Sequence, residues 1–508
     1  MRRGRGRTSL LAWIFCAACA VFIGGCRHTP PAAAPSSPQA PLPSPALRQL
    51  RLDLDAVLQA PALGSGTWGV LVKSLRTGDV LFELNARKLL TPASNLKVIT
   101  LAAAAQTLGW NHTFETRVLG LGAIDFGFLD GDLIVQGTGD PSLAEDDGSA
   151  QQAFRTWADR LKTQGVSALS GRIIGDDNAF DDEPFGAGWM WDDLDQGYSA
   201  GIGALQFNRD AARLTITPGA VVGDPASAIL APDSTGLTLR NRVQTAAADT
   251  PLRIQTRRVP GTPVLDVSGS VPLGTPAIQR TVAVENPTLY FVSELRKALV
   301  ANGIDVRGPA VDVDALNAPL RLQDAAPLVI HRSPPLAVLA DTLMKLSQNQ
   351  YAETLVKTMG ARAGDATFEG GRKVMTELVQ SWGVDASDLF LADGSGLSRY
   401  NLITPDALVT VLSHVHHDAE LKGPFEAALP VAGEAGTLAE RLKGTRAAGI
   451  VRAKTGSMSN VRSIAGYMKT ADDEPIVFAI VANNYGIPGA EADRVADGIL
   501  TRLASFAR

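Results

Sequence analysis

Ser94 and Lys97 are the first pair of side chains whose types and spacing could perform chemistry. They lie three residues apart at the start of the Ala-rich stretch 92–108, which predicts a helix, so the hydroxyl and the amine should project from one face. A lysine can take the proton of a serine when burial and neighbouring cations lower the pKa of the amine. Backbone N–H groups at the helix start can stabilise a developing oxyanion. We therefore predict Ser94 as an acyl-accepting nucleophile and Lys97 as its base.

Ser347-Gln348-Asn349 interrupts a run of apolar residues at helical spacing. Ser and Asn favour such breaks because their side chains compete for backbone hydrogen bonds, so a turn between two helices accounts for the pattern by itself. The functional interpretation adds two roles. Ser347 would relay a proton, and Asn349 would position Lys97 and the amide of the substrate.

Lys454-Thr455-Gly456-Ser457 ends a predicted strand and contains the K-T-G sequence. A glycine on a strand lets a substrate backbone approach closely in β-like pairing. Thr455 and Ser457 offer hydroxyls to a terminal carboxylate, and Lys454 adds positive potential. The N–H of Ser457 would complete an oxyanion hole begun by the N–H of Ser94.

The order S-x-x-K, S-x-N, K-T-G is far less frequent by chance than any one motif, and it is the motif set of β-lactamases and penicillin-binding proteins. The chain resembles the class C low-molecular-mass penicillin-binding proteins, the D-Ala-D-Ala carboxypeptidase/endopeptidase family, over essentially all of the sequence after residue 48. Gln348 is a departure, since an acidic residue is common there in the family. The segments that carry the resemblance are 91–97 (TPASNLK), 393–398 (DGSGLS), 429–433 (LPVAG), 436–438 (GTL) and 451–456 (VRAKTG).

This resemblance implies acyl-enzyme chemistry on peptidoglycan stem peptides and their cross-links. Ser94 would attack the penultimate D-Ala carbonyl, D-Ala would leave, and water or an amine would resolve the ester. The resemblance also implies inhibition by β-lactams and no cofactor. Asp192 and Asp193, which follow Trp189-Met190-Trp191, resemble a family segment near the substrate side chain. A solvated loop is the alternative interpretation of these two carboxylates.

The helices and strands that we expect around these motifs indicate an α+β fold. We expect a β-lactamase/transpeptidase-like domain from residues 49–110 and 286–508, with an antiparallel sheet flanked by helices. Residues 111–285 should form inserted β-rich domains, because short β-rich runs broken by Gly and Pro replace helical periodicity there. The predicted strands are 69–75, 80–85, 450–453, 461–468 and 476–482, and the predicted helices are 92–108, 289–302, 336–346, 351–359, 370–382 and 491–506.

The first 48 residues predict export. Residues 1–26 combine an Arg-rich start with a short apolar run, and Ile23-Gly24-Gly25-Cys26 resembles a lipobox in which Cys26 receives a lipid. A plain signal peptide or an uncleaved anchor is the alternative. Residues 27–48 predict a Pro-rich tether. We therefore expect a periplasmic protein that is anchored to a membrane by lipid, and no disulfide, since all three cysteines lie within the signal segment.

Composition excludes several other classes. With 45% hydrophobic residues the chain is globular, and its net charge of -5 argues against nucleic-acid binding. His414, His416 and His417 predict an exposed helix end, and we expect no metal site. The competing functions are a β-lactamase, for which we find no deacylating glutamate, and a non-enzymatic binding module. A Ser-His-Asp hydrolase lacks support because the sequence contains no G-x-S-x-G.

Overall fold

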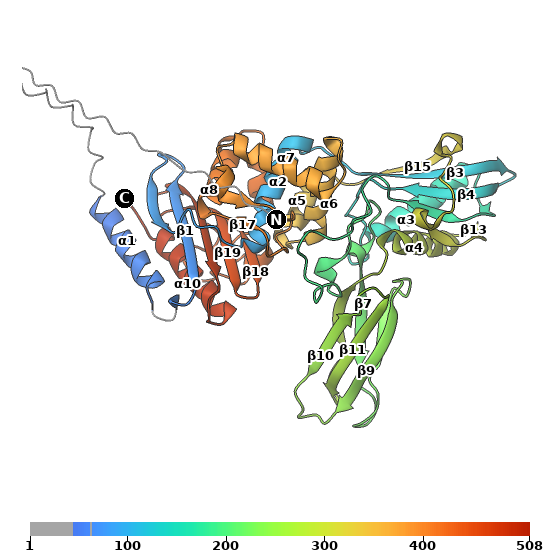
Figure 1. Cartoon of the computed structure of the whole chain (residues 1–508), viewed down its shortest axis with the longest axis horizontal. Helices are drawn as coiled ribbons and strands as arrows, with labels where there is room; N and C mark the ends of the chain where they lie inside the picture. Colours follow the sequence, from blue (N-terminus) through green and yellow to red (C-terminus); the bar gives the residue numbers. More distant parts are fainter. Residues whose placement is uncertain (1–43, 61–62) are drawn as a thin grey trace, which may run out of the picture. The chain divides into compact units, whose positions relative to one another are not determined.

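The main sheet is built from strands at both ends of the sequence (Figure 1). The computed structural model describes residues 44–60 and 63–508. The order of the strands is β18-β19-β20-β1-β2, and every neighbouring pair is antiparallel. The strands are β1 (Thr67–Ser74), β2 (Val80–Leu84), β18 (Arg452–Met458), β19 (Val461–Lys469) and β20 (Pro475–Asn483).

Helices cover both faces of this sheet, and the alternation of side chains along β20 shows why. Val477, Ala479 and Val481 face one helical layer, whereas Phe478 and Ile480 face the other, and all five are buried. The sheet is therefore the middle of three layers (Figure 1). One face carries α2 (Leu96–Leu108), α5 (Leu336–Lys345), α6 (Asn349–Arg362), α7 (Phe368–Ser381), α8 (Pro405–His417) and α9 (Lys422–Ala428), and the other carries α1 (Pro45–Leu58) and α10 (Gly489–Ala504).

Between α2 and α5 the chain forms further sheets. The first has the order β13-β5-β4-β3-β15, with β6 paired to β4 and to β14, and its core includes α3 (Ser149–Thr163) and α4 (Pro287–Ala301). Its strands are β3 (Glu115–Asp125), β4 (Phe128–Gln136), β5 (Ala168–Leu169), β6 (Ile173–Asp176), β13 (Asp305–Val306), β14 (Ala310–Asp312) and β15 (Ala326–Arg332).

Two smaller sheets share a separate core, to which Leu214, Val267 and Val282 contribute. Their orders are β12-β7-β8 and β10-β11-β9, and in the second the pair β11 and β9 is parallel. The strands are β7 (Ala211–Thr217), β8 (Ser227–Ala231), β9 (Thr238–Ala246), β10 (Arg253–Arg258), β11 (Val264–Pro272) and β12 (Ile278–Ala283). Short elements elsewhere are β16 (Leu389–Phe390), β17 (Leu402–Ile403), η5 (Val313–Ala315), η6 (Leu322–Asp324) and η7 (Ala386–Asp388).

The predicted boundary of the insertion at residue 285 differs from the structure. β13, β14 and β15 pair with β5, β6 and β3, so the inserted sheet continues to Arg332 and the chain returns to the main helical layer at α5. The sequence analysis also did not predict α3, which lies inside the insertion. Helical periodicity identifies an amphipathic helix but does not indicate which sheet that helix packs against. The prediction therefore assigned residues 286–332 to the catalytic domain, whereas they belong to the inserted sheet and its core.

The predicted tether, residues 27–48, also overlaps a helix. Pro45 is the first residue of α1, and the hydroxyl of Ser44 caps the helix by accepting from the N–H of Leu47 at 3.1 Å. Proline favours the first helical turn because it lacks an N–H where none is needed. The four residues after Ser44 are therefore helical, and the remainder of the predicted tether lies outside the described residues, as do the signal segment and Cys26.

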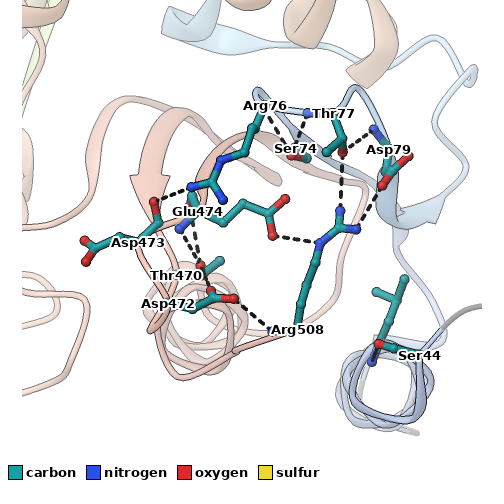
Figure 2. Close-up of polar contacts among 11 residues, drawn as sticks. Ser44, Ser74, Arg76, Thr77, Asp79, Thr470, Asp472, Asp473, Glu474 and Arg508 are labelled. Carbon is teal, nitrogen blue, oxygen red and sulfur yellow. Dashed lines mark hydrogen bonds and ion pairs between the residues drawn. The ribbon is translucent and has the colours of Figure 1, made fainter.

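Arg508 joins two turns at one end of the main sheet (Figure 2). Its Nη1 lies 2.9 Å from Asp79 Oδ2 in the turn between β1 and β2. Its Nε lies 2.9 Å from Glu474 Oε2, which precedes β20. Arg76 reaches across the same end and donates to the carbonyl of Asp473 at 3.1 Å. These contacts satisfy polar groups where the hairpins leave the core.

The three clustered histidines end α8, as predicted, but only His417 is exposed. The ring of His414 stacks on Trp382, and His416 Nδ1 lies 2.8 Å from Glu426 Oε1. Within residues 44–60 and 63–508, no group of three His, Cys, Asp or Glu side chains is arranged to hold a metal ion. In the same ranges, no helix has both the length and the apolar character to span a bilayer.

Replacing Phe478 by alanine should destabilise the main sheet. The ring is fully buried in the central strand β20, so its removal leaves a cavity and should cost about 3–5 kcal/mol of unfolding free energy. Native-state hydrogen exchange of the β20 amides measures this loss separately from the inserted bodies. Phe126→Ala is the matched control because that ring is fully exposed, and it should change the free energy by less than about 0.5 kcal/mol. Equal protection in the two variants would contradict this account of the core.

Candidate active site

Ser94 lies in a short 3-10 turn, η2 (Ala93–Asn95), which leads directly into α2. Two strands of the main sheet hold this turn. Asn95 Nδ2 donates to Ser463 Oγ on β19 at 2.7 Å, and Asn483 Oδ1 on β20 accepts from the N–H of Thr91 at 2.7 Å. The candidate nucleophile is therefore fixed to the sheet just before the helix begins.

Lys97 is fully buried, and its amine contacts Ser94 and Asn349, as predicted, and also the carbonyl of Ser395. Its Nζ lies 3.1 Å from Ser94 Oγ, 2.7 Å from Asn349 Oδ1 and 2.8 Å from the carbonyl of Ser395. Burial lowers the pKa of Lys97 to about 7, although Glu353 and Asp393 oppose this change. A neutral amine keeps two N–H donors, which suffice for Asn349 and Ser395. Its lone pair can then accept the proton of Ser94.

Two buried carboxylates shape the loop that supplies the carbonyl of Ser395. Glu353 accepts from the N–H groups of Gly394 and Ser395, and Asp393 accepts from the N–H of Ser398 at 2.6 Å. Burial raises the pKa of Glu353, and repulsion from Asp393 raises it further. The sequence analysis did not single out Glu353. Its position one helical turn after Asn349 places both on one face of α6, which was the available signal.

Ser347 and Lys454 form a second pair of contacting side chains. Lys454 Nζ donates to Ser347 Oγ at 2.8 Å and to the carbonyl of Thr455 at 2.7 Å. Burial, and then the nearby charge of Lys97, hold the pKa of Lys454 well below its ordinary value. Ser347 adopts a left-handed backbone, with φ of 60°, in the turn between α5 and α6. The S-x-N motif thus contacts both buried lysines, one through each of its two polar residues.

β18 brings the K-T-G motif beside Ser94. A Cβ on Gly456 would lie 2.6 Å from the carbonyl oxygen of Pro92 and 3.0 Å from the nitrogen of Ser94. Glycine is therefore required for the close approach of β18 to η2, a reason different from the predicted room for a substrate. Among the described residues, β18 is the last named strand at its edge of the sheet. Its first residues are covered, because Arg452 forms a bridge with Val431 and the N–H of Ala453 donates to the carbonyl of Pro430 at 3.0 Å. The outer side of the strand beyond Ala453 can pair with an extended peptide. Thr455 Oγ1 lies 2.6 Å from Thr437 Oγ1, and Ser457 is exposed.

Of the two predicted aspartates in the insertion, Asp193 is connected to the motifs and Asp192 is exposed. Asp193 Oδ1 accepts from the hydroxyl of Tyr198 at 2.6 Å, and the carbonyl of Tyr198 accepts from Asn349 Nδ2 at 2.8 Å. Trp189 of the same segment donates to Asp393 Oδ2 at 3.1 Å. No sequence pattern identified Tyr198, because its role depends on a contact between distant segments.

Comparison with known proteins shows which family this chain matches. The model of the D-Ala-D-Ala carboxypeptidase 3 (S13) family matches residues 50–505. A D-alanyl-D-alanine carboxypeptidase of Actinomadura sp. (strain R39) is 36% identical over 473 residues, which cover 91% of this chain and 85% of that protein. D-alanyl-D-alanine carboxypeptidase DacB of Haemophilus influenzae is 28% identical over 434 residues, 84% of this chain and 87% of the relative.

Solved structures give the same result for the fold. The crystal structure of penicillin-binding protein 4 from Haemophilus influenzae superposes with a TM-score of 0.79 at 26% identity, over 89% of this chain and all (100%) of that chain. A structure of the same protein in complex with a β-lactam gives a TM-score of 0.72 at 25% identity, covering 88% and 97% of the two chains. The predicted family and fold class are confirmed, and the chain belongs to the D-Ala-D-Ala carboxypeptidase 3 (S13) family.

Proposed function

We propose that this chain is a serine-type D-Ala-D-Ala carboxypeptidase that cleaves peptidoglycan stem peptides through an acyl-enzyme on Ser94. The observation that carries the proposal is the 3.1 Å contact between Ser94 Oγ and the fully buried amine of Lys97. Burial lowers the pKa of Lys97 to about 7, so a large fraction of this amine is a free base at neutral pH. Membership of the family supports the assignment of substrate.

In the first half of the reaction, Ser94 Oγ attacks the carbonyl carbon of the penultimate D-Ala while Lys97 takes the hydroxyl proton. The N–H groups of Ser94 and Ser457 stabilise the oxyanion. The C–N bond then breaks, and the proton held by Lys97 passes by way of Ser347, which Lys454 contacts at 2.8 Å, to the leaving D-Ala nitrogen, so that Lys97 is neutral again. In the second half, water attacks the ester and gives a proton to Lys97. The C–O bond to Ser94 breaks, and Lys97 returns the proton to Ser94 Oγ.

Substrate recognition falls to the edge of β18 and to Asn349. An extended peptide pairs with the outer side of β18 beyond Ala453, and the hydroxyls of Thr455 and Ser457 receive the terminal carboxylate. A peptide cross-link presents the same D-Ala carbonyl, so the proposal includes endopeptidase cleavage. β-Lactams acylate Ser94 by the same attack. Asp193 accepts a hydrogen bond from the hydroxyl of Tyr198 and contributes to the region that binds the side chain of the substrate. Asp192 is an exposed candidate for the same region.

Export and anchoring complete the proposal. Ile23-Gly24-Gly25-Cys26 supports lipid attachment at Cys26 after cleavage of the signal peptide, and the Pro-rich segment behind it would hold the enzyme off a membrane in the periplasm.

The Ser94 and Lys97 roles can be separated by substitution. Ser94→Ala should abolish covalent penicillin adducts, because it removes the attacking oxygen. Lys97→Arg should lower the acylation rate by at least about 10²-fold, since a guanidinium stays protonated and cannot act as the base. Intact-protein mass spectrometry measures the adducts, and a melting curve verifies the fold of each variant. Acylation by Lys97→Arg within a few-fold of wild type would exclude proton abstraction by Lys97.

The acylation rate should depend on pH through Lys97. Because burial lowers the pKa of this amine to about 7, the reactive neutral form increases as the pH rises through that value. The rate of penicillin acylation should therefore fall with decreasing pH below about 7 and level off above it. Stopped-flow acylation with a fluorescent penicillin, recorded from mildly acidic to mildly alkaline pH, gives the profile. A rate that is flat across this range would contradict a lysine base with a lowered pKa.

Cys26→Ser tests the anchor. The variant should incorporate no labelled fatty acid and should appear in the soluble fraction or remain unprocessed, since serine cannot form the thioether. Metabolic labelling with a fatty-acid analogue, followed by fractionation, measures both effects. A shortened chain that begins at Ser44 serves as the control for catalysis and should acylate like wild type. If the wild-type chain takes up no label, the lipoprotein assignment is wrong.

A further inference from the structure

A cavity of about 480 Å³ lies beside the S-x-N motif and plays no part in the mechanism proposed above. Gln348 and Tyr198 both line it. Gln348 stands between Ser347, which contacts Lys454, and Asn349, which contacts Lys97. A residue that lines the cavity is therefore adjacent in sequence to the partners of both buried lysines, and the other lining residues all belong to the inserted bodies.

Positive charge dominates the lining of this cavity. Arg209, Arg213 and Arg280 line it together with Glu145 and Asp146. Asp146 is neutralised by Arg209, whose Nη2 lies 2.9 Å from Asp146 Oδ2. Burial raises the pKa of Glu145, and the nearby charge of Arg213 opposes this change, so Arg213 acts electrostatically on Glu145. Arg213 and Arg280 are exposed on the neighbouring strands β7 and β12, and neither makes an ion pair with any residue that the structure describes.

The turn that carries Arg209 is strained. The three residues of η4 (Asn208–Asp210) all have positive φ angles of 52°, 57° and 50°, a conformation that residues other than glycine rarely adopt in succession. Arg209 Nε is buried without a hydrogen-bond partner. Such strain persists where surrounding contacts enforce it, and it occurs preferentially at binding sites.

The contact that enforces the turn comes from the helix of the S-x-N motif. Asp210 is fully buried and accepts from the N–H of Phe207 at 3.1 Å and from the side-chain amide of Gln350. Gln350 directly follows Asn349 on α6. The position of the Arg209 turn is therefore set by the same helix that positions Asn349 against Lys97.

We propose that this cavity binds a carboxylate on the acyl part of the substrate, several bonds upstream of the carbonyl that Ser94 attacks. The inference rests on the proposed function and names a recognition element for its substrate. The guanidinium fork of arginine matches a carboxylate, and Arg280 is available for such a contact. The hydrogen bond from Asn349 to Tyr198 connects the reacting end of the peptide to this cavity.

Two synthetic peptides ending in D-Ala-D-Ala test the proposal with the whole exported chain. They differ only in the upstream glutamyl residue, which carries a free α-carboxylate in one peptide and a carboxamide in the other. The carboxylate peptide should have a kcat/KM about tenfold higher, mainly through KM, as expected for a charge-assisted hydrogen bond. Arg280→Gln should remove this preference. Arg253→Gln is the matched control, since Arg253 is exposed on β10 and does not line the cavity, and it should keep the preference.

The outcomes separate this inference from the proposed function. Equal kcat/KM for the two peptides, with normal penicillin acylation, overturns the role of the cavity and leaves the carboxypeptidase assignment intact. Absence of hydrolysis of both peptides together with absence of penicillin acylation contradicts the assignment itself. A preference that survives in Arg280→Gln also overturns the inference. The wild-type comparison decides the question even if Arg280→Gln folds poorly.

Discussion

Two lysines buried side by side are the constraint on which the site depends. Lys97 and Lys454 are both fully buried, and an ammonium group in such a place loses its hydration and repels its neighbour. The protein meets this cost with oxygen acceptors for each amine: Asn349 and the carbonyl of Ser395 for Lys97, and Ser347 for Lys454. The desolvation and repulsion that these acceptors do not offset lower the pKa values of both amines. A lowered pKa is the property that a lysine base needs.

α6 shows how the inserted bodies take part in this arrangement. Most of its polar side chains are buried, and Asn349, Glu353 and Lys357 have partners on other segments. Glu353 holds the loop of Ser395, and Asn349 donates to Tyr198. Lys357 is fully buried and lies 2.7 Å from Asp181. Segments of the main domain and of the insertion thus both supply hydrogen-bond and ion-pair partners for the buried polar groups of α6. The insertion therefore supports the site as well as bordering it.

The elements of the main sheet could be predicted because their patterns are local. β19 and β20 match the predicted runs to within a few residues, since alternation and turn residues are properties of neighbours in sequence. The boundary at 285 could not be placed in this way. α4 has the periodicity of any amphipathic helix, and only its packing against the inserted sheet assigns it to that body.

The sequence by itself was enough to predict the family and the candidate site. Motif order and spacing predicted Ser94, Lys97 and the S-x-N and K-T-G groups as that site, because such side chains must converge for acyl transfer whatever surrounds them. Only the tertiary structure decided how they are tuned. The burial of Lys97, the support from Glu353, and the contact of Tyr198 with Asn349 all join residues far apart in the chain. Desolvation depends on everything packed around a group, and no local pattern records it.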